Sequence, residues 1–353
     1  MFVSPADIGE ARYVKSTTKT LTEAGHETGR KVPANSILFV CIGSTIGKVA
    51  QAGADCTTNQ QINSVIPNSS HDANFLLSLL VKQSSRIRLL AGNQAVPILN
   101  KSEFSKISIT LPTLPEQKKI ADFLTSVDER IGQLIKKKAL LEDYKKGVMQ
   151  QLFSQQIRFK DDNGNDFPDW EEKKLGEVAE VVGGGTPDST NEDYWNGDVQ
   201  WFTPTEIRSK FVSQSKRTIS ESGLKKCSAS ILPVGTLLLT SRATIAEVSI
   251  AREPCTTNQG FQSITVNCNT SNEFIYYWLI QSKKDFLRKA QGSTFLEIGG
   301  KEVRKMMLLI PALEEQKKIA DFLSAIDQKI ESVSQQIAKT QTFKKGLLQQ
   351  MFV

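Results

Sequence analysis

Two short stretches of this chain contain residue types that could support catalysis. The stretch GSTIGK at 43–48 resembles a phosphate-binding loop, in which backbone N–H groups and a lysine surround the phosphates of a nucleotide. It has three residues between its glycines instead of four, and Val49 replaces the hydroxyl that would bind magnesium, so we interpret it as a turn between strands. Residues 168–169 (PD) and 172–174 (EKK) are of the types found in metal-dependent nucleases, but they are too close together for a centre carried on strands.

Histidines and cysteines are too few and too scattered to predict a metal site. His26 and His71 are the two histidines, and no cysteine pair lies near them. The five cysteines lie at least 13 residues apart, which fits neither a CxxC metal site nor a disulfide framework and favours a reducing compartment. The Asn-Pro-Pro-Tyr and Asp-Pro-Pro-Tyr sequences typical of adenine methyltransferases are both missing. We therefore expect no catalytic residue in this chain and no metal or cofactor bound by it.

Basic side chains are the remaining candidates for a functional site, because Arg and Lys bind DNA phosphates and the major-groove edge of guanine. The candidates for DNA binding are Arg12, Lys15, Lys19, Arg30, Lys31 and Lys48 in the first half and Arg208, Lys210, Lys216, Arg217, Arg242 and Arg252 in the second. The alternative for each is an ordinary solvated surface charge. Arg242 stands out because it lies in the turn that follows the apolar run LLLT.

Amide side chains recur at matched positions, as Asn59-Gln60 and Asn258-Gln259. Such a match indicates either a shared role in reading adenine or a shared backbone turn. We favour the turn, because two domains that read different bases should differ where they touch them. By this reasoning the divergent segments are better candidates for base reading: 9–32 against 208–232, and 91–100 against 290–300.

Two long helical stretches, 114–153 and 313–352, are nearly the same sequence at a constant offset of 199 residues. Apolar residues advance along each by threes and fours, which is a heptad seam. The seam positions are Ile120, Leu124, Val127, Ile131, Leu134, Leu141 and Val148 in the first stretch and Ile319, Leu323, Ile326, Ile330, Val333, Ile337 and Leu347 in the second. Neither helix can bury such a seam alone, so we expect the two helices to pack on each other.

The same offset extends to the rest of the chain, which is therefore an internal repeat. CTTNQQINSV at 56–65 matches CTTNQGFQSI at 255–264, and a 45-residue insert at 155–199 separates the two copies. Met1 pairs with Gln200, so the first globular domain starts about thirty residues late compared with the second, and its sheet is expected to lack an edge strand.

Each globular part alternates β-rich runs with helical segments. The runs are SILFVCI, QINSVIP and KISITLP in the first copy and GTLLLTS, FQSITV and KMMLLIP in the second; the helical segments are 73–90 and 273–290. The stretch 157–170 is polar and turn-rich and is expected to be an exposed connection. We expect a first domain at 1–111, a long helix at 112–155, a linker at 156–169, a second domain at 170–310 and a second long helix at 311–353.

Composition sets broad limits on the kind of protein. A content of 39% hydrophobic and 23% charged residues is ordinary for folded protein, and a net charge of +6 is compatible with a polyanionic partner without requiring one. Residues 1–110 hold 11 Lys and Arg against 7 Asp and Glu, so the excess is concentrated there. The N-terminus lacks the pattern of a signal peptide and no stretch approaches 18 apolar residues, so we expect a cytoplasmic protein without a membrane segment.

The sequence resembles the DNA-specificity subunits of Type I restriction-modification systems. The likeness is carried by the helix starts LPEQKKIADFL and LEEQKKIADFL, the helix ends YKKGVMQQLF and FKKGLLQQMF, and FPDWEEKKLGEV at the start of a domain. It implies an α+β fold: two α/β target recognition domains in tandem, separated by two long conserved helices that form an antiparallel coiled coil, with a pseudo-two-fold internal repeat. The N-terminal shortfall of the first domain departs from the family pattern.

The resemblance also implies a function and a set of partners. Each domain would read one half of a bipartite, asymmetric site in double-stranded DNA. The helical seam residues would set the spacing and dock two methyltransferase subunits. S-adenosylmethionine, ATP and magnesium would be bound by those subunits and by a restriction (motor-nuclease) subunit.

Two other classes of function stay open at this point. One is a structural or signalling coiled-coil protein whose globular ends bind proteins. A gel-shift assay with the methyltransferase subunits present would distinguish it, because only a DNA-binding subunit should form a sequence-specific, salt-sensitive complex. The other is an enzyme with a cryptic centre, which methyl transfer by the isolated chain would reveal.

Overall fold

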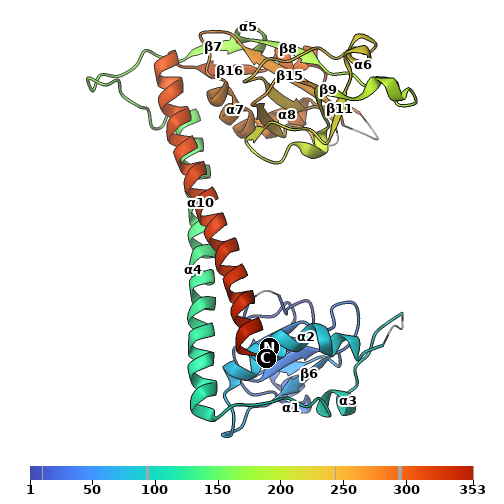
Figure 1. Ribbon diagram of the computed structural model, residues 1–353. Helices are drawn as coiled ribbons and strands as arrows, with labels where there is room; N and C mark the ends of the chain where they lie inside the picture. Colours follow the sequence, from blue (N-terminus) through green and yellow to red (C-terminus); the bar gives the residue numbers. More distant parts are fainter. Residues whose placement is uncertain (10, 93–94, 243, 293–295, 353) are drawn as a thin grey trace. The chain divides into compact units, whose positions relative to one another are not determined.

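The computed structural model describes residues 1–9, 11–92, 95–242, 244–292 and 296–352. The chain forms two compact units, and each long helix contributes to both (Figure 1). The first unit comprises Met1–Ala139 with Ser332–Val353, and the second comprises Leu140–Glu331. No helix in the described ranges is long and apolar enough to cross a membrane.

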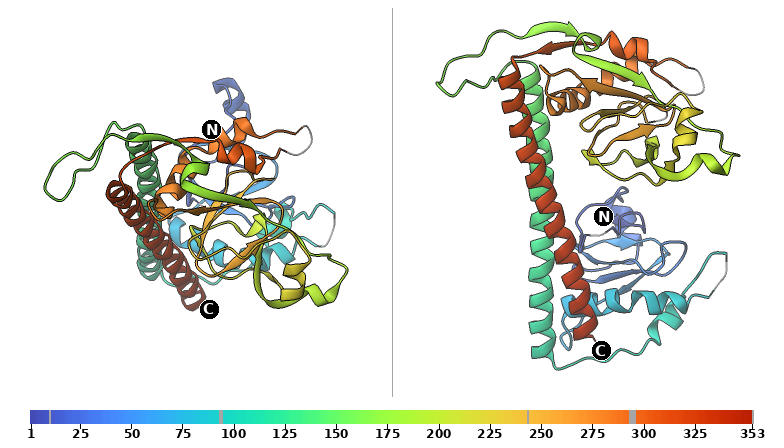
Figure 2. Two further views of the ribbon diagram at one scale, coloured as in Figure 1. Left: turned by 90° about the horizontal axis from the view of Figure 1, so that it is seen from above. Right: turned by 45° about the horizontal axis from the view of Figure 1, so that its top comes forward.

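The long helices are α4 (Leu114–Phe153) and α10 (Leu313–Met351), and within each unit a part of α4 lies antiparallel beside a part of α10 (Figures 1 and 2). The predicted seam residues are buried or half-buried throughout, and Leu124, Ile319 and Leu323 are fully buried. Each such leucine or isoleucine stabilises the packed helices by roughly 1.5–3 kcal/mol relative to exposure. Acidic residues occupy the first turn of both helices, where they complement the positive end of the helix dipole.

The globular domain of the first unit, which we call the first domain, has a four-stranded sheet in the order β2-β4-β3-β6 and a separate β1-β5 pair. Its strands are β1 (Phe2–Val3), β2 (Tyr13–Val14), β3 (Ile37–Val40), β4 (Val49–Ala52), β5 (Thr57–Thr58) and β6 (Ile62–Val65), and its helices are α1 (Glu23–Thr28), α2 (Ala73–Leu89) and α3 (Lys101–Ser105). Strand β3 is buried on both faces: Ile37 and Phe39 pack against α2, whereas Leu38 and Val40 face the opposite core.

The globular domain of the second unit, the second domain, repeats this plan with more strands. Its main sheet has the order β10-β13-β12-β15-β8, and smaller sheets have the orders β11-β9-β14 and β16-β7. The strands are β7 (Glu171–Lys174), β8 (Ala179–Gly183), β9 (Trp195–Phe202), β10 (Phe211–Val212), β11 (Arg217–Ile219), β12 (Leu237–Thr240), β13 (Val248–Ala251), β14 (Cys255–Thr257), β15 (Phe261–Val266) and β16 (Met307–Ile310). The helices are α5 (Leu175–Val178), α6 (Glu221–Lys225), α7 (Asn272–Gln281), α8 (Lys283–Lys289) and α9 (Gly300–Arg304), with 3-10 turns η1 (Glu192–Tyr194) and η2 (Pro204–Glu206).

Strand pairing shows which residues of the two domains are equivalent. Leu38 pairs with Ser64 in the first domain, and Leu238 pairs with Ser263 in the second, so β3 corresponds to β12 and β6 to β15. Tyr13 pairs with Gln51, and Phe211 pairs with Ile250, so β2 corresponds to β10. The predicted internal repeat of two α+β domains and two long helices is confirmed.

One local prediction was wrong. KISITLP at 106–112 forms no strand, because the described residues of the first domain contain no counterpart of β7, the strand that pairs with β16 in the second domain. The segment 273–290 is helical as predicted, but it is divided into α7 and α8, which meet at Ser282. The stretch 157–170 is exposed over most of its length, as predicted, but Phe167 and Trp170 near its end are buried.

The two main sheets differ at one edge: among the described residues, β6 borders only β3, whereas the equivalent β15 lies between β12 and β8.

Candidate nucleic-acid interface

Equivalent glutamines fix each domain to the start of its long helix. In the first unit, Gln117 Nε2 donates to the Pro112 carbonyl oxygen at 2.8 Å, and its Oε1 accepts from the Asp72 backbone N–H at 3.0 Å. In the second unit, Gln316 makes the same two bonds, to Pro311 and Ser271, at 2.8 Å each. Both glutamines are buried, so each amide group joins the helix start to the residue that caps α2 or α7.

Asp128 joins three segments of the first unit. Its carboxylate accepts from Arg12 at 2.9 Å and pairs with Lys344 of α10 at 2.5 Å. Arg12 also donates to the Asn74 carbonyl oxygen of α2 at 3.4 Å. The Arg12 side chain is only 9% exposed, so its charge is compensated inside the protein.

Asp327 occupies the equivalent place in the second unit. It pairs with Lys145 of α4 at 2.6 Å and accepts from the Tyr277 hydroxyl at 2.7 Å. Lys210 completes the cluster, with its Nζ 2.5 Å from Glu273, 3.0 Å from the Tyr277 hydroxyl and 3.0 Å from Ser324 Oγ. Burial, followed by the hydrogen bond to Asp327, raises the pKa of Tyr277 well above its usual range, so this hydroxyl stays protonated as a donor.

Arg12 and Lys210 are therefore structural equivalents, placed directly before β2 and β10. Both were predicted from the sequence to contact DNA. In the structure Arg12 pairs with Asp128 of α4, and Lys210 pairs with Glu273 of α7 and donates to Ser324 of α10. Two ion pairs that join α4 to α10, Asp128 with Lys344 and Lys145 with Asp327, follow the antiparallel direction of the helices.

The second unit has a further buried ion pair where α4 leads into the second domain. Arg158 makes two bonds to Glu315, at 3.2 and 2.8 Å, and the Trp170 indole N–H donates to the same carboxylate at 3.1 Å. Glu315 is fully buried, and its hydrogen bonds raise the pKa of Arg158. Glu116, at the equivalent position of α4, is exposed.

Loops of the second domain meet where β9, β12 and β14 end. Ser241 N donates to the Gly260 carbonyl oxygen at 2.7 Å, and Asn258 N donates to Phe202 at 3.0 Å. Gly185 N donates to Thr257 at 2.9 Å. A Cβ at Gly184 would lie 2.1 Å from the Asn258 carbonyl oxygen, so only glycine permits this approach. We call the ends of these three strands, together with the loops that follow them, the loop edge of the second domain.

The first domain has the same loop edge with fewer segments. Cys41 N donates to the Gln61 carbonyl oxygen at 2.7 Å, and Asn59 N donates to Val3 at 3.0 Å. Leu99 N donates to Cys41 at 2.8 Å. The segment that would correspond to 184–186 is absent from the described residues of this domain, because Met1 is equivalent to Gln200.

Matched carboxylates anchor the divergent segments 9–32 and 208–232 at the two loop edges. Asp7 accepts from the backbone N–H and hydroxyl groups of both Ser4 and Thr18, at 2.7 to 2.9 Å. Burial of this carboxyl raises its pKa, but the four hydrogen bonds outweigh burial and lower the pKa to about 2. Glu206 likewise accepts from Thr203 N at 2.8 Å and from Lys216 N at 2.6 Å.

Ten of the twelve candidate DNA contacts are exposed, and several lie at or beside a loop edge. Arg208 donates to the Thr205 carbonyl oxygen at 2.9 Å, and Arg242 pairs with Glu297 at 2.8 Å. The Arg217 guanidinium lies 3.6 Å from the centroid of the Trp195 ring. The backbone N–H of Lys216 donates to Glu206, and Lys19 is the residue after Thr18, whose N–H donates to Asp7. Lys48 lies in the β3–β4 hairpin loop.

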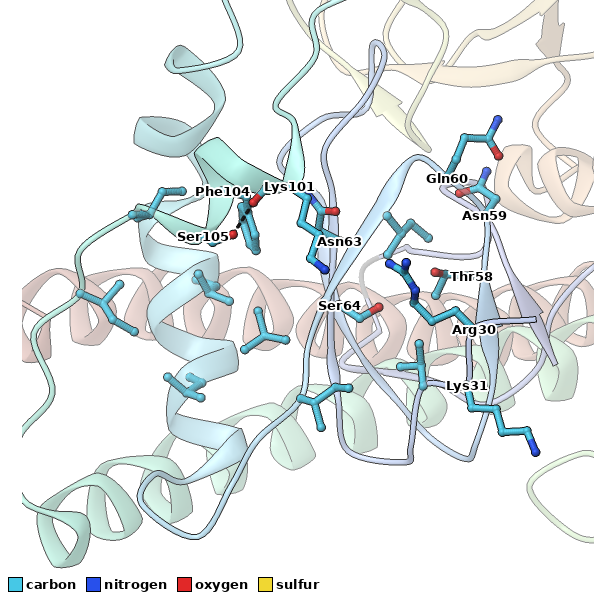
Figure 3. A pocket seen from close by; sticks show the side chains of 18 residues that line it. Arg30, Lys31, Thr58, Asn59, Gln60, Asn63, Ser64, Lys101, Phe104 and Ser105 are labelled. Atoms are coloured by element: carbon cyan, nitrogen blue, oxygen red, sulfur yellow. Dashed lines mark hydrogen bonds between the residues drawn. The ribbon is translucent and has the colours of Figure 1, made fainter. Parts of the chain in front are cut away.

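Arg30 and Lys31 line a cavity of about 1040 Å³ together with Thr58, Asn59 and Gln60 (Figure 3). Arg252 and Lys15 lie elsewhere. Arg252 directly follows β13 in the second domain, and Lys15 directly follows β2 in the first. Each therefore lies at the end of its own sheet opposite the loop edge. The Arg252 guanidinium stacks 4.1 Å from the Phe211 ring centroid.

The matched amides form turns, as we favoured from the sequence. Asn59 Oδ1 accepts from Gln61 N at 3.1 Å, and Asn258 Oδ1 accepts from Gly260 N at 2.8 Å. Gln60 and Gln259 are exposed beside these turns. Of the divergent segments proposed to read bases, Glu10, Asn93–Gln94 and Ser293–Phe295 lie outside the described residues.

The stretch 43–48 is the hairpin loop between β3 and β4, as predicted. The backbone N–H groups of Gly43, Ile46, Gly47 and Lys48 donate to carbonyl oxygens within the domain, so they are not directed at a phosphate. Within the described ranges, no group of three or more His, Cys, Asp or Glu side chains is placed to hold a metal ion.

The residues that attach the domains to the helices were not predicted from the sequence. Gln117 and Gln316 are part of the repeated EQKKIADFL stretch, and this repetition was the available signal. Asp128 and Asp327 are also matched at the 199-residue offset, next to apolar seam positions.

Comparison with known proteins identifies the family. The family model for the Type I restriction modification DNA specificity domain matches residues 5–142 and 168–341, which together make up most of the chain. The chain belongs to this family. The two matched regions correspond to the two copies of the repeat, so this member of the specificity-domain family carries the domain twice.

Named relatives and solved structures agree with this assignment. The MjaIX specificity subunit of Methanocaldococcus jannaschii is 38% identical over 190 residues, covering 52% of this chain and 44% of that subunit. The chain thus spans less than half the length of that relative. The MjaVIII specificity subunit of the same organism is 24% identical and is matched over 96% of this chain and 81% of its own length.

Among solved structures, a Type I restriction-modification S subunit from M. genitalium superposes with a TM-score of 0.61 at 19% identity, covering 98% of this chain and 90% of that one. A chain from a study of complex assembly and conformational transition of the Type I system gives 0.63 at 18% identity, covering 99% and 90%. At this level of identity the likeness shows the fold.

Proposed function

We propose that this chain is the DNA-recognition subunit of a Type I restriction-modification complex, and that each domain reads one half of a bipartite site in double-stranded DNA. The helices α4 and α10 set the distance between the half-sites and bind two adenine methyltransferase subunits. Methyl transfer and cleavage are carried out by other chains, which bind S-adenosylmethionine, ATP and magnesium.

The repeated junction is the observation that carries this proposal. Gln117 and Gln316 make equivalent pairs of hydrogen bonds. Asp128 joins Arg12 of the first domain to Lys344 of the facing helix, and Asp327 joins the Tyr277 hydroxyl of the second domain to Lys145 of the facing helix. Reading a split site requires two recognition surfaces at a defined separation, and in this proposal the helix pair, with an equivalent attachment for each domain, has that role.

The loop edges are the proposed DNA-contacting surfaces. They combine divergent segments held by Asp7 and Glu206 with exposed cations such as Lys48, Arg208 and Arg242. Cations of this kind contact phosphates, and variable loops between fixed anchors supply base-specific contacts.

The second domain offers a test with an internal control. In a complex assembled with the methyltransferase subunits of its system, Arg208→Ala should weaken binding of the cognate duplex and reduce the salt dependence, by roughly 0.9 in the log–log slope if one phosphate contact is lost. Arg252→Ala removes another exposed charge, at the opposite sheet edge, and should leave both the affinity and the salt dependence unchanged. Equal effects of the two substitutions would contradict the placement of DNA at the loop edge.

A further inference from the structure

Two tryptophans of the second domain form a fixed aromatic platform at the loop edge. Trp195 is the first residue of β9 and Trp201 is the residue before its last, and their rings meet edge to face with centroids 5.1 Å apart. The Trp195 indole N–H donates to the Asp188 carbonyl oxygen at 3.1 Å. The Trp201 indole N–H donates to the Gly185 carbonyl oxygen at 2.8 Å. Because both buried rings are bonded to the backbone and packed on each other, their orientation is set before any ligand binds.

The Arg217 guanidinium is stacked on this platform. Its central carbon lies 3.6 Å from the centroid of the Trp195 ring and 5.7 Å from that of the Trp201 ring. A separation of 3.6 Å is an ordinary contact distance between stacked carbon atoms. The planar guanidinium therefore lies close to flat on Trp195, since a steep tilt would drive one of its nitrogens into the ring.

The backbone that carries this arginine is also held in place. Arg217 pairs with Trp201 in the ladder between β11 and β9, which lie side by side (Figure 1). Ser215 Oγ accepts from Trp201 N at 2.9 Å and donates to the Arg217 carbonyl oxygen at 2.6 Å. The neighbouring Lys216 N donates to Glu206 at 2.6 Å. The side chain and its backbone are both positioned, so binding a ligand costs Arg217 little conformational entropy.

The hydrogen-bonding edge of Arg217 is open. The side chain is exposed, and its nitrogens make no hydrogen bond or ion pair within the described part of the chain. Arg208 and Arg242 differ in this respect, because the first donates to the Thr205 carbonyl oxygen and the second pairs with Glu297. The donors of a guanidinium lie in its own plane. Arg217 therefore presents a fork of N–H groups in a plane that the Trp195 ring fixes.

A fixed fork of this kind fits two adjacent acceptors that lie in one plane. The major-groove edge of guanine offers O6 and N7 in this arrangement, and a phosphate offers two oxygens. The position of Arg217 in the divergent segment 208–232 favours guanine. Its equivalent in the first domain is Lys19, which bridges to Phe2 as Arg217 pairs with Trp201. Domains that read different bases should differ where they touch a base, whereas a phosphate contact needs no such rigid orientation.

We propose that Arg217 is a specificity-determining residue, which donates two hydrogen bonds to O6 and N7 of one guanine in the half-site of the second domain. Trp195 and Trp201 are positioning residues, since they hold the guanidinium without touching the base. This inference rests on the proposed function, and it adds a G·C pair that the half-site must contain.

The test uses the full chain in a complex with the methyltransferase subunits of its system. Sequencing of methylated adenines gives the site of the parent complex, and binding is then measured at one salt concentration for duplexes in which each base pair of that site is replaced in turn. Arg217→Ala should lower the preference for one G·C pair by about tenfold and leave the preferences at the other positions unchanged. Arg217→Lys keeps the charge but not the planar fork, so it should retain the salt dependence of the parent without restoring that preference.

Arg252→Lys is the matched control, because it also replaces an exposed arginine stacked on an aromatic ring, at the opposite end of the sheet. It should leave every base preference as in the parent. Unchanged base preferences in both Arg217 variants would overturn the inference while leaving the proposed function intact. Equal weakening of all duplexes by Arg217→Ala, restored by Arg217→Lys, would assign the side chain to a phosphate and would also overturn it. A parent complex without any sequence preference would instead overturn the proposed function, and this inference with it.

Discussion

The buried carboxylate of Glu315 allows a stringent test, because the repeat provides its control within the same chain. Glu315→Gln keeps the shape of the side chain but removes the charge that Arg158 contacts twice and places an amide where both acceptor oxygens are used. Glu116→Gln makes the same change at the equivalent position of α4, which is exposed.

The magnitude follows from burial. Breaking a buried ion pair costs about 3–5 kcal/mol, and the partial exposure of Arg158 reduces this toward the lower end. The amide can still accept one hydrogen bond, from Arg158 or Trp170, so we expect a loss of about 2–4 kcal/mol for the second unit. For a unit of this size the midpoint should fall by roughly 5–15 °C. Glu116→Gln should change stability by less than about 0.5 kcal/mol.

Thermal unfolding followed by circular dichroism measures the difference, and hydrogen exchange of residues 156–174 localises it to the second unit. Because the chain has two units, the local exchange data are needed to attribute the loss. Similar effects of the two substitutions, or exchange that increases in the first unit instead, would refute the reasoning.

Asp128→Asn should destabilise the first unit by about 3 kcal/mol, because it leaves both Arg12 and Lys344 without their carboxylate. Lys344→Met should cost about 1 kcal/mol, since Arg12 retains its partner. Urea unfolding measures both losses, and a larger loss for Lys344→Met would be inconsistent with these contacts. Gln117→Ala and Gln316→Ala should each cost about 1–3 kcal/mol, because each leaves a buried or half-buried carbonyl oxygen and a backbone N–H unpaired. A negligible loss at either site, measured in the same way, would argue against the proposed attachment. Burial raises the pKa of the Cys41 thiol to about 11 and that of the Cys255 thiol to about 12. Iodoacetamide at pH 8 should therefore modify the exposed Cys268 first, as measured by mass spectrometry. Early modification of either buried thiol would contradict this burial.

Periodicity predicted the long helices and their seam, because the offset of 199 residues placed the same apolar residues on the same face of both. The strands β3 and β12 were also predictable, since each is a short apolar run bounded by turns. These features depend on local sequence, and local sequence was sufficient for them.

Features that depend on distant partners were not predictable in this way. KISITLP and KMMLLIP are similar sequences, and only the second forms a strand, because only the second has β7 beside it. Arg12 and Lys210 were assigned to DNA because they are basic residues in divergent segments. Their equivalence becomes visible only from strand pairing, since they lie 198 rather than 199 residues apart.

The central claim is that the helix pair sets the distance between two half-sites, and a matched change in both helices tests it directly. One heptad inserted after Ala139 and one after Glu331 would preserve the apolar seam and lengthen the pair by about 10 Å, or roughly three base pairs of DNA. Sequencing of methylated adenines in cells that carry the complete system would give the spacer. We predict the same two half-sites with a spacer about three base pairs longer. Methylation at the original spacing would contradict the account.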